Sequence, residues 1–159
     1  VVVKVGRRLY DELCAITGAR IFKAELGKPT VIGGYEITID CVASSATLDD
    51  ALRWTRPRGL VVIVGMPAIP RGVDWTPIWH KELRVLGSYT YGIERWHGKS
   101  IHTIELSLQM MNAHRDEFNG MLTHCYRLTQ YREAFRVAMH AGQYGAIKVA
   151  FDLRENTRK

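Results

Sequence analysis

Hydrophobic residues in the first forty positions recur first at helical and then at strand-like spacing. Leu9, Leu13 and Ile16 fall on one face of a helix, which the following Thr-Gly pair ends. Residues 24–35 contain several glycines and a proline, so we expect an irregular connection there. The apolar alternation of residues 37–42 then predicts a strand.

Two further helix–strand pairs follow along the chain. Thr47 is the expected N-cap of a helix that ends near Pro57. Residues 60–64 form a nearly continuous β-branched run, which is typical of a strand buried on both faces. A short helix over 76–82 and a strand over 84–90 complete a β-α-β-α-β order. This order predicts an α/β fold with a parallel sheet and helical crossovers.

The last seventy residues have a different pattern, in which a long helix is followed by a strand, a shorter helix and a second strand. We expect a helix-strand-helix-strand segment there, and we place its boundary with the first part after residue 90. Its expected elements are a helix over 100–114, an extended segment over 122–128, a helix that begins at Thr129 and a strand over 146–152.

Composition and charge narrow the classes of partner. The chain has 159 residues, of which 47% are hydrophobic and 24% charged, and no apolar run approaches the ~18 residues of a membrane span. We therefore expect a cytoplasmic protein with no membrane partner. The formal charge is +6, but scattered basic residues without interleaved aromatics disfavour nucleic-acid binding. His124 and Cys125 would point to opposite faces of a strand, so we expect no metal site.

Five short motifs occur in order between about residue 36 and residue 152. Together they resemble the C-terminal half of the zinc-type, medium-chain alcohol dehydrogenases. The resemblance implies a partial dinucleotide-binding, Rossmann-like domain over residues 1–90. It also implies that residues 91–159 pack with the catalytic domain in whole enzymes. The motifs are Asp-Cys-Val-Ala at 40–43 with ALRWTRPRG at 51–59, VVIVGMP at 61–67, KELRVLGS at 81–88, LTHCYRLTQYREAF at 122–135 and IKVAFD at 147–152.

The resemblance assigns a nicotinamide cofactor, NAD or NADP, to the carboxyl ends of the strands, where doubly wound sheets bind dinucleotides. Gly65 would permit close approach of the backbone and Met66 would offer an apolar wall. The backbones of Ser88 and Thr90 would hold the carboxamide, and Lys148 the pyrophosphate. Without the resemblance, the turn after Val64 is an ordinary strand-to-loop turn, and Lys148 is a surface residue. The expected cofactor-binding residues are Val64, Gly65, Met66, Ser88, Thr90 and Lys148.

Two parts that the family uses have no match in the sequence. Residues 2–6 look like the strand before a Gly-x-Gly-x-x-Gly turn, but Arg7 and Arg8 follow it. Side chains there keep a pyrophosphate away from the backbone. The resemblance places the zinc ligands in an N-terminal domain that has no counterpart here. We therefore expect weak or no binding of NAD or NADP, no catalytic residue, and no activity of this chain alone.

Two functions remain open. The first is an incomplete chain of an alcohol dehydrogenase, whose intact form transfers hydride between NAD(P) and a small-molecule alcohol or carbonyl. The second is a non-catalytic module from that family, which dimerises or binds nucleotides or nucleic acid. The missing first strand would leave the strand over 37–42 with an open edge. The resemblance implies a second self-association edge at 84–90, because dimeric members of the family extend their sheets across a twofold axis there. We expect a homo-oligomer, in the simplest case a dimer, unless residues 1–5 fill the vacancy.

Overall fold

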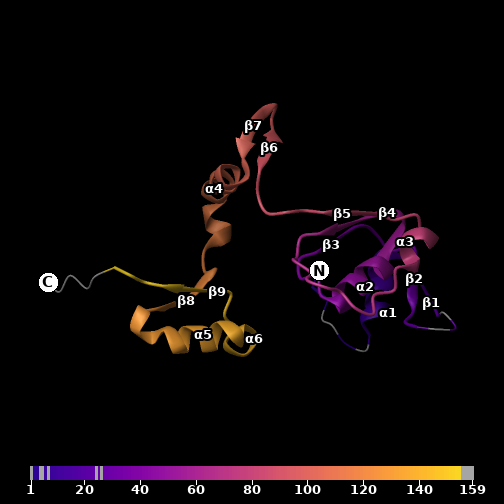
Figure 1. Cartoon of the computed structure of the whole chain (residues 1–159), viewed down its shortest axis with the longest axis horizontal. Helices are drawn as coiled ribbons and strands as arrows, with labels where there is room; N and C mark the ends of the chain where they lie inside the picture. The colour runs from indigo at the N-terminus through magenta and orange to yellow at the C-terminus, as the bar shows by residue number, and fades with distance from the viewer. Residues whose placement is uncertain (1, 4–5, 7, 24, 26, 155–159) are drawn as a thin grey trace. The chain divides into compact units, whose positions relative to one another are not determined.

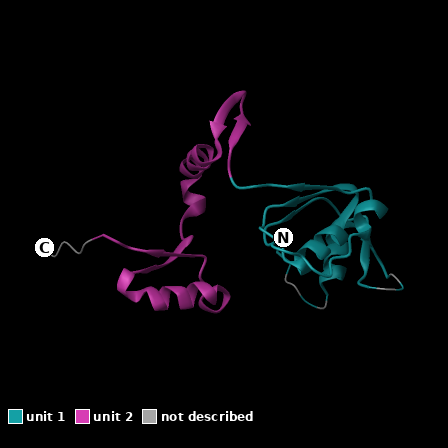
Figure 2. Cartoon of the chain, viewed as in Figure 1, with its two compact units in different colours: residues 1–90 teal, residues 91–159 magenta. Residues whose placement is uncertain are grey.

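The computed structural model describes residues 2–3, 6, 8–23, 25 and 27–154. The chain divides into two compact units, Val1–Thr90 and Tyr91–Lys159, which Figure 2 colours separately. The proposed strand over 1–5 and the proposed glycine-turn position at residue 7 fall largely outside the described residues.

The first unit begins with helix α1, Leu9–Thr17. Gly18 ends the helix in the left-handed conformation, at φ 68°, which glycine adopts without steric cost. Leu9 and Leu13 are buried, as the spacing predicts. Ile16 lies in the same helix, but 45% of this residue is exposed.

A hairpin follows α1 where the sequence predicted an irregular connection. Strands β1, Arg20–Phe22, and β2, Thr30–Ile32, pair in antiparallel fashion. Val31 is almost fully buried, at 1% exposure. Each strand has three residues, which is too short for an apolar alternation to stand out among the neighbouring glycines.

A parallel sheet of three strands forms the centre of the first unit (Figure 1). Its order is β3-β4-β5, and both pairs of neighbouring strands are parallel. The predicted β-α-β-α-β order and α/β class are confirmed. The strands are β3, Tyr35–Asp40, β4, Thr55–Ile63, and β5, Arg84–Gly87, and the crossover helices are α2, Ser45–Trp54, and α3, Thr76–His80.

The two ends of α2 differ from the prediction. Ser44, not Thr47, is the N-cap, because its hydroxyl accepts a hydrogen bond from the Thr47 amide at 3.2 Å. The sequence offers two hydroxyl residues three positions apart, and either can cap a helix. The helix ends at Trp54, and Pro57 lies inside β4. Strand β4 therefore begins five residues earlier than its apolar run.

Only one face of the sheet carries a core. Val61 is wholly buried and packs with Ala51 and Leu52 of α2. On the other face, more than half of Ile37 and Ile39 is exposed. The prediction of a central strand buried on both faces was wrong within the described residues, since β-branched side chains stand on both faces but helices cover one.

Ionic groups join α2 to the segments around it. The Arg53 guanidinium donates to the Asp49 carboxylate at 3.1 Å and to Asp74 at 2.9 Å. Lys81 is 3% exposed, and its ammonium donates to the main-chain oxygens of Arg53 and Thr55 at 2.6 and 2.9 Å. Desolvation by burial, with the nearby positive charge of Arg53, lowers the pKa of Lys81 to about 8. Lys81 thus binds the carbonyl end of α2 without a carboxylate partner in the described part of the chain.

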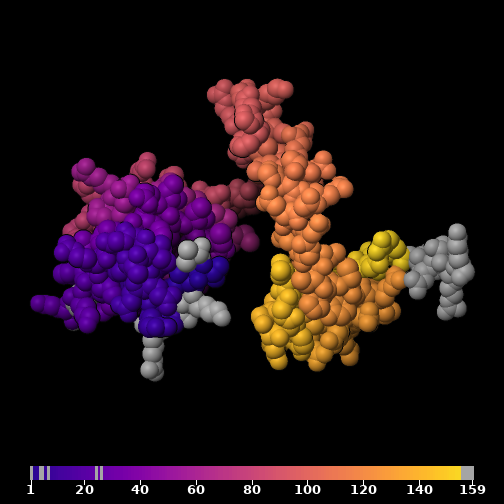
Figure 3. Space-filling view, turned by 180° about the vertical axis from the view of Figure 1, so that it is seen from behind, coloured from indigo at the N-terminus to yellow at the C-terminus, as the bar shows by residue number. Residues whose placement is uncertain are grey.

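The second unit begins with a hairpin that the sequence analysis missed. Strands β6 and β7 pair in antiparallel fashion, so the long helix, α4, starts at Thr103 rather than near residue 100. No described residue of α4 is buried, and in Figure 3 the hairpin and α4 stand apart from the lobe that ends the unit. The elements are β6, Ile93–Trp96, β7, Lys99–His102, α4, Thr103–Ala113, η1, Arg115–Phe118, β8, Leu122–Tyr126, η2, Leu128–Gln130, α5, Tyr131–Met139, α6, Ala141–Tyr144, and β9, Lys148–Phe151.

The remaining elements of the second unit follow the predicted order. Strands β8 and β9 form a parallel pair, and α5 packs on it through the buried Ala134 and Val137. The helix begins at Tyr131, after a short turn over 128–130, and not at Thr129. In the described ranges, no helix combines the length and apolarity that crossing a bilayer requires.

Candidate functional site

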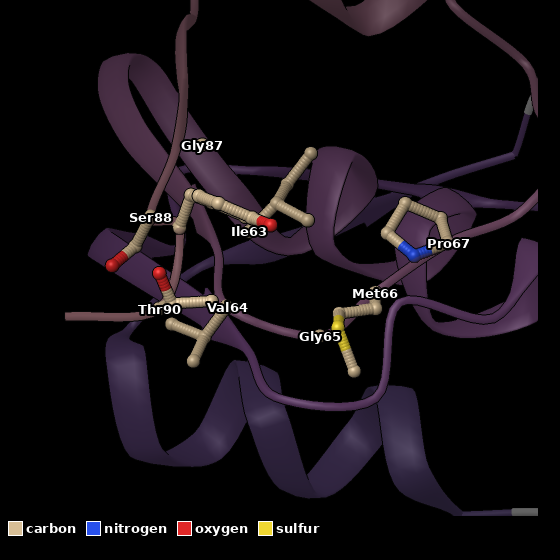
Figure 4. Close-up of a pocket in the computed structure, with 9 residues that line it drawn as sticks. Ile63, Val64, Gly65, Met66, Pro67, Gly87, Ser88 and Thr90 are labelled. Atoms are coloured by element: carbon tan, nitrogen blue, oxygen red, sulfur yellow. The ribbon is translucent and has the colours of Figure 1, made fainter.

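The carboxyl ends of β4 and β5 meet at a pocket of about 790 Å³ (Figure 4). Its walls come from two segments, the turn that follows β4 and the turn that follows β5. The parallel pairing of Ile63 with Gly87 brings the two turns side by side, and the Ser88 amide continues the ladder by donating to the Ile63 oxygen at 2.8 Å. The lining residues are Ile63, Val64, Gly65, Met66, Pro67, Gly87, Ser88, Tyr89 and Thr90.

Gly65 lies where the β4 turn touches the turn after β3. A Cβ atom on Gly65 would stand 2.4 Å from the Val42 carbonyl carbon and 2.7 Å from the Ala43 nitrogen. Real Cβ atoms do not approach backbone atoms so closely, so any other residue here would push the two turns apart. Close contact between two backbones is what glycine provides at ligand sites.

The β5 side of the pocket supplies polar main-chain groups. The amides of Tyr89 and Thr90 make no backbone hydrogen bond within the described residues. Thr90 has φ 48°, a left-handed conformation that is an outlier for a β-branched residue. Backbone strain of this kind is concentrated at binding and catalytic sites.

The chemistry of the lining is mainly apolar. Ile63, the last residue of β4, and Val64, Met66 and Pro67 of the following turn present carbon and sulfur atoms (Figure 4). The hydroxyl-bearing residues stand on the opposite, β5 side. An apolar wall facing a few main-chain donors and acceptors suits a flat ring that carries an amide group. No group of three or more histidine, cysteine, aspartate or glutamate side chains is placed to hold a metal ion in the described ranges.

Five of the six residues expected from the sequence line this pocket together. The sixth, Lys148, begins β9 in the second unit. Its ammonium makes no hydrogen bond within the described residues, and its main-chain oxygen accepts from the Thr123 hydroxyl at 3.1 Å. Sequence reasoning missed four lining residues, although each adjoins a predicted position: Ile63, Pro67, Gly87 and Tyr89.

A family model described as "Zinc-binding dehydrogenase" matches residues 11–105. The match covers more than half of the chain and includes both turns of the pocket. The chain belongs to the zinc-binding dehydrogenase family. The resemblance that the five motifs carry is thereby confirmed at the level of the family.

The curated relatives include sugar-acid, polyol and L-threonine dehydrogenases by name. L-idonate 5-dehydrogenase from Vitis vinifera is 29% identical over 78% of this chain and 31% of its own length. Sorbitol dehydrogenase from Arabidopsis thaliana is 28% identical over 74% of this chain and 30% of its own length. The chain therefore spans about a third of the length of the curated relatives it matches.

Solved structures share the fold at low sequence identity. 2R,3R-butanediol dehydrogenase from Bacillus subtilis matches with a TM-score of 0.64 and 16% identity, over 94% of this chain and 36% of that one. Zinc-dependent alcohol dehydrogenase 2 from Streptococcus pneumonia gives 0.59 and 21%, over 77% and 33%. An alcohol dehydrogenase from Escherichia coli CFT073, solved with NADH, gives 0.52 and 17%, over 73% and 32%.

Proposed function

We propose that the pocket at the ends of β4 and β5 binds the nicotinamide half of NAD or NADP. The observation that carries the proposal is the meeting around one cavity of Gly65, the apolar residues beside it, and the amides of Tyr89 and Thr90, for which the described part of the chain supplies no backbone acceptor. The turn would hold one face of the ring, and the free amides would orient the carboxamide. Bound nicotinamide would accept or supply a hydride, as it does in dehydrogenases generally.

We further propose that hydride transfer to or from an alcohol or carbonyl is the activity of a whole enzyme and not of this chain alone. The chain spans about a third of its relatives' length, and zinc would be held by ligands outside it. The names of the relatives support a small molecule with a secondary alcohol, such as a polyol, a sugar acid or L-threonine, as the class of substrate. The expected result of an assay with sorbitol, NAD and added zinc is no turnover. Turnover above the enzyme-free rate would overturn this part.

The nicotinamide proposal is tested by NMR titration of the ¹⁵N-labelled chain with reduced nicotinamide mononucleotide, with adenosine monophosphate as the comparison. We expect shifts at residues 63–67 and 87–90 with the first ligand and none there with the second. We expect millimolar affinity, because the mononucleotide lacks the pyrophosphate and adenosine through which a whole dinucleotide would make further contacts. Shifts elsewhere, or no shift at tens of millimolar ligand, would refute the proposal.

A matched pair of variants sharpens this test. Val64→Asp places a carboxylate on the apolar wall, at a side chain that is already 44% exposed, so folding is spared. Ile16→Asp makes the same change at a 45% exposed residue of α1 that does not line the pocket. Only the first is expected to abolish the shifts. Equal loss of the ligand-induced shifts in both variants would count against the assigned position of the ligand.

The second candidate function is self-association through the sheet. Strands β3 and β5 are the two edges of the described sheet, and the face with Ile37, Ile39 and Leu86 has no core. Edges and apolar patches of this kind favour pairing with another chain. Sedimentation velocity is expected to give a dimer for the wild-type chain and a monomer for Ile39→Lys. A monomer at all concentrations for the wild type would remove this candidate.

A further inference from the structure

Asp40, the last residue of β3, holds two turns at once. Its main-chain oxygen accepts hydrogen bonds from the amides of Val64 and Gly65 at 2.9 and 3.0 Å. Its carboxylate oxygen Oδ1 accepts from the amides of Val42 and Ala43 at 3.0 and 2.8 Å. One residue therefore fixes the turn after its own strand through its side chain, and the turn after β4 through its backbone.

The turn that the carboxylate holds is conformationally strained. Ala43 has φ 56° and is 3% exposed. An alanine in this left-handed region is less stable than in ordinary backbone, so the turn needs interactions that oppose its relaxation. The two hydrogen bonds from the Val42 and Ala43 amides to Asp40 Oδ1 supply them.

Strain at this turn matters for the pocket because Gly65 rests on it. The glycine backbone lies against the Val42 carbonyl and the Ala43 nitrogen, with no room for a Cβ atom. If residues 42–43 relaxed, they would move into or away from the Gly65 backbone, and the pocket wall would move with it. Asp40 itself does not line the pocket, so its effect would pass through Gly65.

We propose that Asp40 is the positioning residue of the nicotinamide pocket: its carboxylate locks residues 42–43, and these set the place of Gly65. The proposal rests on the proposed function for its ligand, but not for its geometry. The second carboxylate oxygen, Oδ2, is buried and has no hydrogen-bond partner. The positioning role therefore needs one acceptor oxygen and not the full carboxylate.

The two oxygens of Asp40 allow a clean substitution test. Asp40→Asn keeps an acceptor oxygen for the two amides, while Asp40→Ala removes it. Asp49→Ala is the matched control, because Asp49 is also buried in this unit but bonds to Arg53, Lys28 and the Asp74 amide rather than to the turns. The readouts are amide hydrogen exchange at residues 42, 43, 64 and 65, and the affinity for reduced nicotinamide mononucleotide.

We expect Asp40→Ala to speed exchange at these amides and to weaken the ligand at least tenfold, which corresponds to 1.4 kcal/mol. We expect Asp40→Asn to stay within about threefold of the wild type, and Asp49→Ala to leave affinity unchanged. Wild-type affinity in Asp40→Ala, or equal loss in Asp40→Asn, would overturn the proposal. If Asp40→Ala does not fold, the comparison of Asp40→Asn with the wild type still tests the proposal.

The two proposals fail in different ways. If the wild-type chain does not bind the mononucleotide, the proposed function fails, but amide hydrogen exchange still tests the positioning role of Asp40. Faster exchange at Val64 and Gly65 in Asp40→Ala, but not in Asp40→Asn, would then uphold the positioning role. Unchanged amide exchange in both Asp40 variants would refute the positioning role.

Discussion

Lys81 makes the stability of the first unit rise with pH in the alkaline range. Burial lowers its pKa from 10.5 to about 8. Below pH 8 the amine is protonated in both the folded and the unfolded chain. Between pH 8 and 10.5 only the unfolded chain keeps the proton. Because the unfolded state then binds more protons than the folded state, the free energy of unfolding increases with pH in this window.

The size of the effect follows from the shift. One pKa unit corresponds to 1.36 kcal/mol, so the contribution of Lys81 grows by about 3 kcal/mol across the window. Lys81 is 3% exposed, so solvent screens this contribution little. Other groups titrate there too, among them Tyr10, whose pKa burial raises. The Lys81 contribution must therefore be isolated by comparison with a variant.

Lys81→Met is the suitable variant, because it keeps the length of the side chain and cannot titrate. Urea denaturation at several pH values between 7 and 10.5 is followed by tryptophan fluorescence, with Trp96 replaced by Phe so that the signal comes from the first unit. The difference in unfolding free energy, wild type minus variant, is expected to grow by about 3 kcal/mol. A difference that stays constant within 0.5 kcal/mol or so would refute this account of Lys81.

Two further substitutions test the packing around the pocket and α2. Gly65→Ala should destabilise the first unit by about 1–3 kcal/mol in thermal unfolding, because the added Cβ atom would meet backbone atoms. Gly87→Ala is the control: its Cβ atom would meet nothing within 4 Å, so stability should change by under ~0.5 kcal/mol. Arg53→Met should cost about 3 kcal/mol at pH 7. Burial raises the pKa of Asp49, but the hydrogen bonds from Arg53, Lys28 and the Asp74 amide together outweigh burial and lower this pKa, so the cost in urea denaturation should shrink below pH 4. A cost independent of pH would argue against this ion pair.

The parallel sheet was predictable because its strands carry strong local signals. Strand β4 contains a β-branched run, and helices with clear amphipathic spacing separate it from β3 and β5. The missed hairpins lack such signals. In the hairpin of β6 and β7, most residues are exposed, so no alternation separates an inner from an outer face.

The exposure of the second sheet face was not predictable from the run of apolar residues. Leu60 and Val62 look the same in the sequence whether or not helices cover them. What covers a face depends on how many crossovers the chain contains and on which side each one passes, and only α2 and α3 connect the described strands. The apolar run therefore predicted side chains that can be buried on either face, and the placement of the helices determines which face is buried.

The location of the candidate site followed from topology, but its internal support did not. Parallel strands bring their carboxyl ends together, which is why Val64 and Ser88 could be paired from the sequence alone. The contact of Gly65 with Val42, and the use of Asp40 by both turns, depend on backbone conformations that no residue pattern encodes. The left-handed alanine at position 43 is one such case, because sequence rules expect glycine there.

The pocket is assembled from contacts within the first unit, between residues 40–43, 63–67 and 87–90, and this bears on what the chain can do by itself. Each of these contacts is a backbone hydrogen bond or a close backbone approach in the three-stranded sheet, so they do not wait for a partner domain. Among the described residues of the first unit, none was expected to bind the rest of a dinucleotide, and Lys148, the residue expected at the pyrophosphate, belongs to the other unit. A chain built in this way should recognise the nicotinamide end of the cofactor by shape, while tight binding and the choice between NAD and NADP would have to come from other parts of a whole enzyme.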